Sequence, residues 1–145
     1  MLKSISYNNN IVLNAVKYHN KYSVPDKLSE KEKIFCNITR DADKIDIIFT
    51  QFKDKYSDDF KINDETLNYF KERKLIPNNY SDHKSIIILR QLAFIFDLNF
   101  NKSLEIIRDS NIINEMVNLF YEATKDKNIY LVENLVNSYI NERID

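Results

Sequence analysis

The chain has 145 residues, a formal net charge of −1 and no glycine. Because glycine lets backbone N–H groups approach a phosphate closely, its absence excludes the Rossmann fingerprint, the Walker-type loop and the Gly-x-Ser-x-Gly nucleophile elbow. With 21 basic and 22 acidic side chains, the chain has no electrostatic footprint for nucleic acid or for an anionic membrane, so neither is expected as a partner. One cysteine and two histidines exclude an intramolecular disulfide and a zinc-finger motif, and they favour a cytoplasmic location.

The overall pattern predicts an all-α fold. Only two prolines interrupt long stretches of helical periodicity, so we expect a compact bundle of six or seven helices in one domain over residues 1–145. The most apolar stretch, residues 86–98, is shorter than the roughly 20 residues of a membrane span. The N-terminal residues lack the apolar core of a signal peptide.

The first two helices are predicted from periodicity and capping. Apolar residues recur at helical spacing through about residues 9–21, and Pro25 prevents continuation. Ser29 and Glu32 form a capping box, which predicts a second helix running to about residue 54. The apolar stripe of this helix, expected to face the core, consists of Ile34, Ile38, Ala42, Ile45, Phe49 and Phe52.

Five more helices are predicted downstream of a polar turn at residues 56–59. Asp64 is expected to cap a helix that ends near residue 74, before Pro77. Ser81 or Asp82 is expected to cap the helix over 86–98, which should be the most buried. Asn101 is expected to cap a short helix over 102–108. The last two predicted helices cover residues 112–123 and 129–143.

The most distinctive motif lies at residues 40–46, which read Arg-Asp-Ala-Asp-Lys-Ile-Asp. Upstream, residues 15–20 read Ala-Val-Lys-Tyr-His-Asn, and Val-Pro follows at 24–25. Together with the later stretch at 92–100, these segments resemble the C-terminal half of an HD-domain protein, from about residue 11 to the end. The resemblance implies an HD-domain-like all-α fold and a relation to phosphohydrolases that attack phosphate esters with metal-bound water.

The resemblance also implies a metal site. In the intact family the cofactor is a divalent metal such as Mn, Mg or Fe; Asp43 matches a ligand aspartate, and His19 resembles a ligand of a second metal. The family's His-Asp doublet does not occur here, since the one neighbouring pair is Asp82-His83, in reverse order. A hydrolytic metal normally needs three or more protein ligands, so we expect little or no hydrolase activity. The missing ligands would precede Met1, which predicts a truncated domain.

The carboxylates around Asp43 have different expected roles. On a helical wheel, Asp43 lies opposite the apolar stripe, on the side of Cys36. Asp41 lies near the stripe's edge, where an ionised carboxylate needs a partner, so a structural role is predicted. Asp46 points in a third direction and is expected either to pair with a basic residue or to support a ligand. A salt-bridged helix face without metal is the alternative.

The remaining polar candidates are weaker. Arg40 and Lys44 are candidate contacts to a phosphate-containing small molecule. His19 lies amid apolar residues, so a satisfied core histidine is the alternative to a ligand. His83 follows an expected helix cap and is interpreted as a surface residue without chemistry. Cys36 is expected to be a small buried hydrophobic residue.

Two other functional classes lead to different expectations. A half domain would expose apolar surface, so a non-enzymatic interaction module is the alternative, binding either a second copy or a separate N-terminal half. A ribonuclease of the HEPN type is disfavoured, because its arginine stands a few residues before the histidine, whereas Arg73 is ten residues before His83. The substrate of the related hydrolases is not readable from these residues.

Overall fold

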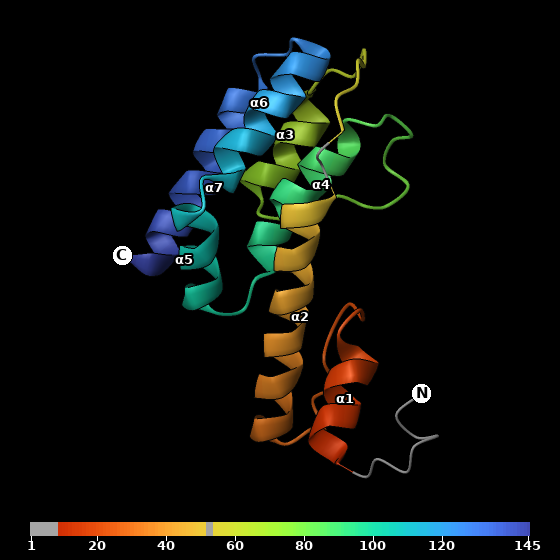
Figure 1. The fold of residues 1–145 in the computed structure, drawn as a ribbon, viewed down its shortest axis with the longest axis vertical. Helices are drawn as coiled ribbons and strands as arrows, with labels where there is room; N and C mark the ends of the chain where they lie inside the picture. The colour runs from red at the N-terminus through yellow and green to blue at the C-terminus, as the bar shows by residue number, and fades with distance from the viewer. Residues whose placement is uncertain (1–8, 52–53) are drawn as a thin grey trace. The chain divides into compact units, whose positions relative to one another are not determined.

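The computed structural model describes residues 9–51 and 54–145. These residues form seven α-helices and a short 3₁₀ turn, with no strand, so the all-α prediction is confirmed (Figure 1). The elements are α1 (Asn10–Tyr18), α2 (Glu30–Thr50), α3 (Asp64–Lys71), α4 (Ile86–Phe94), η2 (Ile95–Asp97), α5 (Asn101–Asp109), α6 (Ile112–Thr124) and α7 (Ile129–Ile144). Among the described helices, none combines the length and the apolar character that crossing a membrane requires.

The chain divides into two compact units, Met1–Asp43 and Lys44–Asp145, with α2 running through the boundary. We call them unit 1 and unit 2 and describe each by itself. The single domain expected over residues 1–145 stays a prediction.

Unit 1 contains α1 and the first part of α2. The capping box is confirmed, because the Ser29 N–H donates to Glu32 Oε2 over 2.8 Å and the Glu32 N–H donates to Ser29 Oγ over 3.2 Å. The hydrogen bonds that the Glu32 carboxylate accepts from Ser29 lower the pKa of this carboxyl. The Asn14 amide donates to the other Glu32 oxygen over 2.8 Å. The cap of α2 therefore also ties α1 to α2.

The first part of α2 buries a different side from the predicted stripe. Ile34 and Ile38 are each 49% exposed, and Ala42 is exposed as well, so the prediction is wrong for these three. The buried residues are instead Cys36, Arg40 and Asp41. The reason is tertiary: Arg40 binds the segment that follows α1, so the side of α2 that carries Arg40 is covered. Burial raises the pKa of the Cys36 thiol, as expected for a small buried residue.

The end of α2 follows the prediction better. Ile45 and Phe49 are partly buried against the core of unit 2, and Ile48 is completely buried in it. Phe52, the last residue of the predicted stripe, lies outside the described residues. The same apolar period thus faces a core only in the half of the helix that belongs to unit 2.

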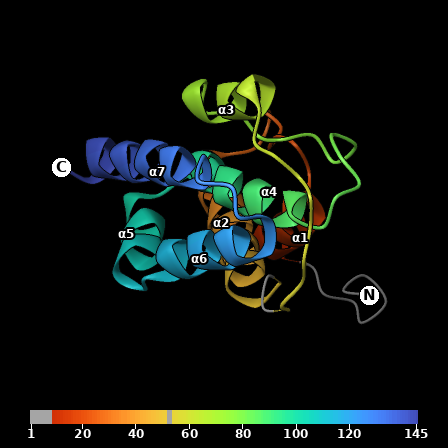
Figure 2. The ribbon, with the colours of Figure 1, turned by 90° about the horizontal axis from the view of Figure 1, so that it is seen from above.

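Unit 2 is a helical bundle around one apolar core. Its helix α7 packs against α3, α5 and α6, and α4 packs against α6 (Figure 2). Six of the nine residues of α4 are buried, in agreement with the strongly buried helix predicted there. The largest side chains of the core that are fully buried include Phe70, Phe120, Leu92 and Met116.

Three helices of unit 2 are followed or ended by a left-handed residue that is not glycine. Arg73 after α3 and Lys125 after α6 both have φ of 56°, and Asn111 after α5 has φ of 61°. After α3, the Lys74 N–H bonds to the Tyr69 carbonyl over 2.8 Å, and after α6 the Lys125 N–H bonds to the Tyr121 carbonyl over 2.7 Å. Glycine is the usual residue at such positions, because a Cβ costs about 1–2 kcal/mol there. A glycine-free chain thus accepts local strain to terminate its helices.

Candidate functional site

Arg40 joins two of the segments that carry the family resemblance. The residue is only 4% exposed, and its guanidinium donates to the backbone carbonyls of Tyr18, Lys21 and Tyr22, at 3.5 Å to Tyr18 and 3.1 Å to Tyr22. The last carbonyls of a helix have no partner within it, so Arg40 caps α1 and holds the turn that follows. The turn after α1, which begins at His19, is therefore held against α2, the helix that also carries Asp43.

His19 is held in a defined orientation. It is half-buried, and its Nδ1 lies 2.6 Å from the Val16 carbonyl oxygen. A carbonyl oxygen only accepts hydrogen bonds, so Nδ1 carries the proton and Nε2 presents a lone pair when the ring is neutral. That tautomer is the one a metal-binding histidine needs, since its second nitrogen is then oriented by a backbone carbonyl.

The other residues of the 40–46 motif lie in different surroundings. Asp41 is buried and Asp43 is half-buried. Lys44 Nζ pairs with Asp97 over 3.0 Å. Asp46 is exposed and has no ion pair among the residues that the structure describes. The metal ligation expected of Asp43 and His19, and the phosphate contacts expected of Arg40 and Lys44, stay predictions.

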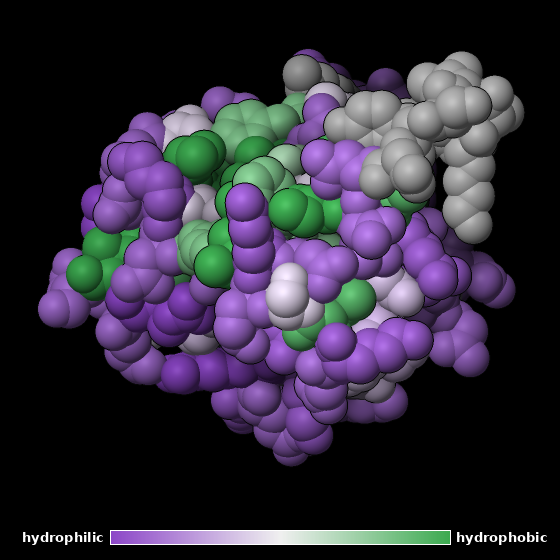
Figure 3. Space-filling model, turned by 90° about the horizontal axis from the view of Figure 1, so that it is seen from below, coloured by the Kyte–Doolittle hydropathy of each residue, from purple (hydrophilic) through white to green (hydrophobic). Residues whose placement is uncertain are grey.

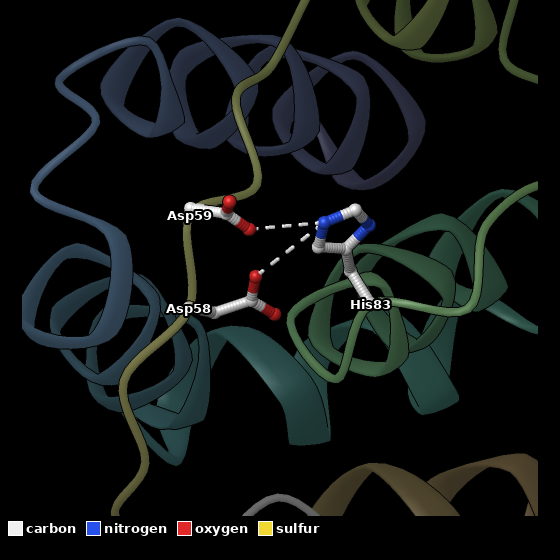
Figure 4. A group of neighbouring side chains, drawn as sticks. All are labelled: Asp58, Asp59 and His83. Atoms are coloured by element: carbon white, nitrogen blue, oxygen red, sulfur yellow. Dashed lines mark hydrogen bonds and ion pairs between the residues drawn. The ribbon is translucent and has the colours of Figure 1, made fainter.

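A second cluster of polar side chains lies in unit 2 and comprises Asp58, Asp59 and His83 (Figure 4). His83 Nε2 lies 3.1 Å from Asp59 Oδ1 and 3.9 Å from Asp58 Oδ1. The two aspartates come from the segment before α3, and the histidine comes from the segment before α4. Elsewhere in the described residues, no group of three such side chains places its ligand atoms this close together.

Asp58 is the fixed member of the Asp58–Asp59–His83 cluster. Its side chain is 7% exposed. Its Oδ1 accepts a hydrogen bond from the Phe60 N–H, and its Oδ2 accepts one from the Ser85 N–H, each over 2.9 Å. Burial raises the pKa of this carboxyl, but the hydrogen bonds from Ser85 and Phe60 and the charge of His83 outweigh burial, so the pKa is lowered. The Asp58 carboxylate therefore holds the two segments together as an anion.

The sequence alone does not reveal this cluster. Its pattern makes His83 a surface residue and residues 56–59 a polar turn. The contact joins residues 24 positions apart in the chain, and no motif spacing links them. The adjacent pair Asp58-Asp59 is the one available signal, and a pair of acidic residues in a turn is too common to be informative.

Comparisons of this chain with protein-family models, with curated proteins and with solved structures found no match.

Proposed function

We propose that this chain is an HD-domain-like helical protein that does not hydrolyse phosphate esters by itself. The observation that most directly supports a relation to HD-domain proteins is that Arg40 donates hydrogen bonds to the carbonyls of Tyr18, Lys21 and Tyr22. It packs together two segments whose residues resemble the family. Consecutive helices commonly pack against each other, so this contact is compatible with the resemblance, which itself rests on the residues of the two segments.

The donors on these two segments are too few for hydrolysis. His19 offers Nε2, and Asp43 offers a carboxylate that has no hydrogen bond or ion pair within the described residues. One nitrogen and one carboxylate fall short of the three or more protein ligands that hold a catalytic metal. This donor set fits weak cation binding, and no catalytic step is derived from it.

The test combines a hydrolysis assay with a spectrum of the histidine rings. We expect tag-free protein with Mn²⁺ to show no turnover of a generic phosphodiester or of nucleotides above the metal blank. Paramagnetic Mn²⁺ should broaden the His19 ring signals, and Asp43→Asn should reduce that broadening, because it removes the negative charge of the second donor. Asp46→Asn is the matched control and should leave the broadening unchanged.

Two results would contradict the proposal. Turnover that disappears in Asp43→Asn would make the chain an enzyme. If Mn²⁺ broadens the His19 ring signals equally in the wild type and in Asp43→Asn, then His19 and Asp43 do not bind one cation together, although the family resemblance places both at a metal site.

The second candidate function is association through an exposed apolar surface. Apolar side chains reach the surface among hydrophilic ones on the face shown in Figure 3. In unit 1, the exposed large apolar side chains that α1 and α2 carry are Val16, Ile34, Phe35 and Ile38. Contiguous exposed apolar surface favours association.

Analytical sedimentation tests whether the chain associates with itself or stays monomeric. If the apolar surface is an interface between copies, the wild type should gain mass with concentration, and Ile34→Asp combined with Ile38→Asp should restore the monomer. Lys31→Asp, on an exposed position of the same helix, is the matched control. A wild type that stays monomeric at about 100 µM, well above the usual micromolar range of stable dimers, would remove self-association.

A further inference from the structure

We propose that Asp58, Asp59 and His83 form a binding site for a divalent first-row transition-metal cation such as Zn²⁺. The site belongs to unit 2 and shares no residue with the His19 and Asp43 pair, so it stands independently of the proposed function. The choice of cation follows from the donors: an imidazole nitrogen with carboxylate oxygens suits zinc and its neighbours, whereas Mg²⁺ and Ca²⁺ prefer oxygen alone.

The spacing of the three donor atoms suits such a cation. His83 Nε2 lies 3.1 Å from Asp59 Oδ1 and 3.9 Å from Asp58 Oδ1, and all three ligand atoms lie within 4.8 Å of one another. Metal–ligand bonds of about 2.0–2.2 Å place neighbouring ligands about 3–3.5 Å apart. Small side-chain rotations therefore suffice to surround one ion, and water can fill its remaining positions.

His83 is already aimed at the two carboxylates (Figure 4). Its Nδ1 lies 3.0 Å from Ser81 Oγ, and its ring packs against Phe60 at 5.5 Å between centroids. A hydroxyl can either donate or accept. Ser81 can thus accept from a protonated Nδ1 when Nε2 binds metal, which is the arrangement that orients metal-binding histidines.

The charges around the cluster favour a cation. Neither Asp58 nor Asp59 pairs with a lysine or an arginine among the described residues, and the ion-pair partner of both is His83. The neighbouring Lys84 ammonium lies over the Tyr56 ring, 5.1 Å from its centroid. Two carboxylates held this close repel each other, and a divalent ion between them removes that repulsion.

The buried hydroxyl of Ser85, beside Asp58, adds a second observation. The Ser85 side chain has no exposed surface, and neither its hydroxyl nor that of Tyr56 has a hydrogen-bond partner of normal geometry among the described residues. The Ser85 hydroxyl lies close enough to the Asp58 carboxylate and to the Tyr56 hydroxyl to act on the pKa of both groups, in each case to lower it. Buried hydroxyls without partners are costly. A cation bound at Asp58, with its coordinated water, would offer the Ser85 hydroxyl a partner of better geometry.

The burial of the donors permits entry from solvent. The side chain of Asp58 is 7% exposed, that of His83 is 46% exposed and that of Asp59 is 94% exposed. The buried carboxylate is fixed by backbone amides, while the exposed one is free to close over the ion. The bound cation would connect the segment before α3 to the segment before α4.

The test uses the fact that the chain has only two histidines. In tag-free protein stripped of metal, Zn²⁺ should shift the ring nitrogen signals of His83 with saturation at one equivalent per chain, while His19→Ala assigns the two rings. We expect Asp59→Asn and His83→Ala each to lower the Zn²⁺ affinity at least about tenfold in calorimetry, the effect typical of lost metal-site partners. Asp59 is almost fully exposed, so Asp59→Asn should keep the fold.

Matched controls separate binding at this cluster from binding at His19 and from nonspecific attraction of cations. His19→Ala should leave the Zn²⁺ affinity unchanged, and Mg²⁺ should not shift the His83 ring. The proposal is overturned if His83→Ala and Asp59→Asn bind Zn²⁺ as the wild type does, or if no shift of His83 occurs up to about 1 mM Zn²⁺, the weak end of the affinity scale. A shift confined to His19 would also overturn it, while leaving the proposed function of the other pair intact.

Discussion

Replacing Arg40 by methionine should destabilise unit 1 by about 3 kcal/mol, because the end of α1 and the turn that follows lose a buried, charged donor. The guanidinium donates to the carbonyl of Tyr18, the last residue of α1, and to those of Lys21 and Tyr22 in the turn. Methionine retains much of the apolar stem but donates no hydrogen bond. The measurement is hydrogen exchange at amides of α1 around the buried Ala15, whose protection reports the local free energy of opening.

Two further variants test whether the loss of amide protection comes from the hydrogen bonds of Arg40. Arg40→Lys keeps the charge but lacks the planar fork of donors, so it should recover only part of the lost protection. Lys31→Met removes an exposed cation of the same helix and should change stability by less than about 0.5 kcal/mol. Equal protection in Arg40→Met and in the wild type would show that the α1 carbonyls do not depend on Arg40.

Replacing Asp126 by alanine should lower the free energy of unfolding of unit 2 by about 3 kcal/mol. Asp126 is 8% exposed; its Oδ2 accepts from the Ile62 N–H over 2.7 Å, and its Oδ1 accepts from the Asn128 N–H over 3.0 Å. Alanine would leave both donors without their partner, and a buried donor without a partner costs about 1–3 kcal/mol. Urea denaturation monitored by circular dichroism measures the change.

The neighbouring contacts explain why this position matters. The Asn128 amide donates to the Ile62 carbonyl over 3.2 Å, and Lys61 Nζ donates to the Thr124 carbonyl over 2.5 Å. The turn between α6 and α7 is thereby attached to the segment before α3. Asp126→Asn keeps one acceptor oxygen and should cost about half as much as alanine. Asp82→Ala, at an exposed position, should be neutral, and a loss as large as that of Asp126→Ala would refute the assignment.

The positions of the helices could be predicted because they depend on neighbouring residues. The predicted starts at residues 112 and 129 match those of α6 and α7, and the capping box at Ser29 and Glu32 forms as predicted. Some ends differ by a few residues. Asn63 rather than Asp64 caps α3, since its Oδ1 accepts the Thr66 N–H over 2.9 Å. Both side chains are good caps, so only the backbone angles at the boundary distinguish them.

The candidate sites were predictable only in part. The segments at residues 15–20 and 40–46 direct attention to His19 and Asp43, but the two segments are connected by Arg40, for which the sequence suggests a phosphate contact. The capping of α1 by Arg40 depends on the α1 turn lying against α2, and no local pattern encodes that approach. The buried face of α2 is mispredicted for the same reason. Ile34 and Ile38 have the spacing of a buried helix face, but no segment packs over them and they stay exposed.

The sequence by itself determined that this chain is helical, where most of its helices lie and which glycine-dependent sites it cannot build. These properties follow from periodicity, capping and composition, which act over one or two helical turns. Tertiary structure alone decided which faces are buried and which distant side chains meet, as Asp59 meets His83 across 24 positions. It also imposed left-handed residues at Arg73 and Lys125. The physical reason is that burying side chains between segments stabilises the fold more than the conformational preference of any single residue, so packing decides the outcome wherever two segments meet.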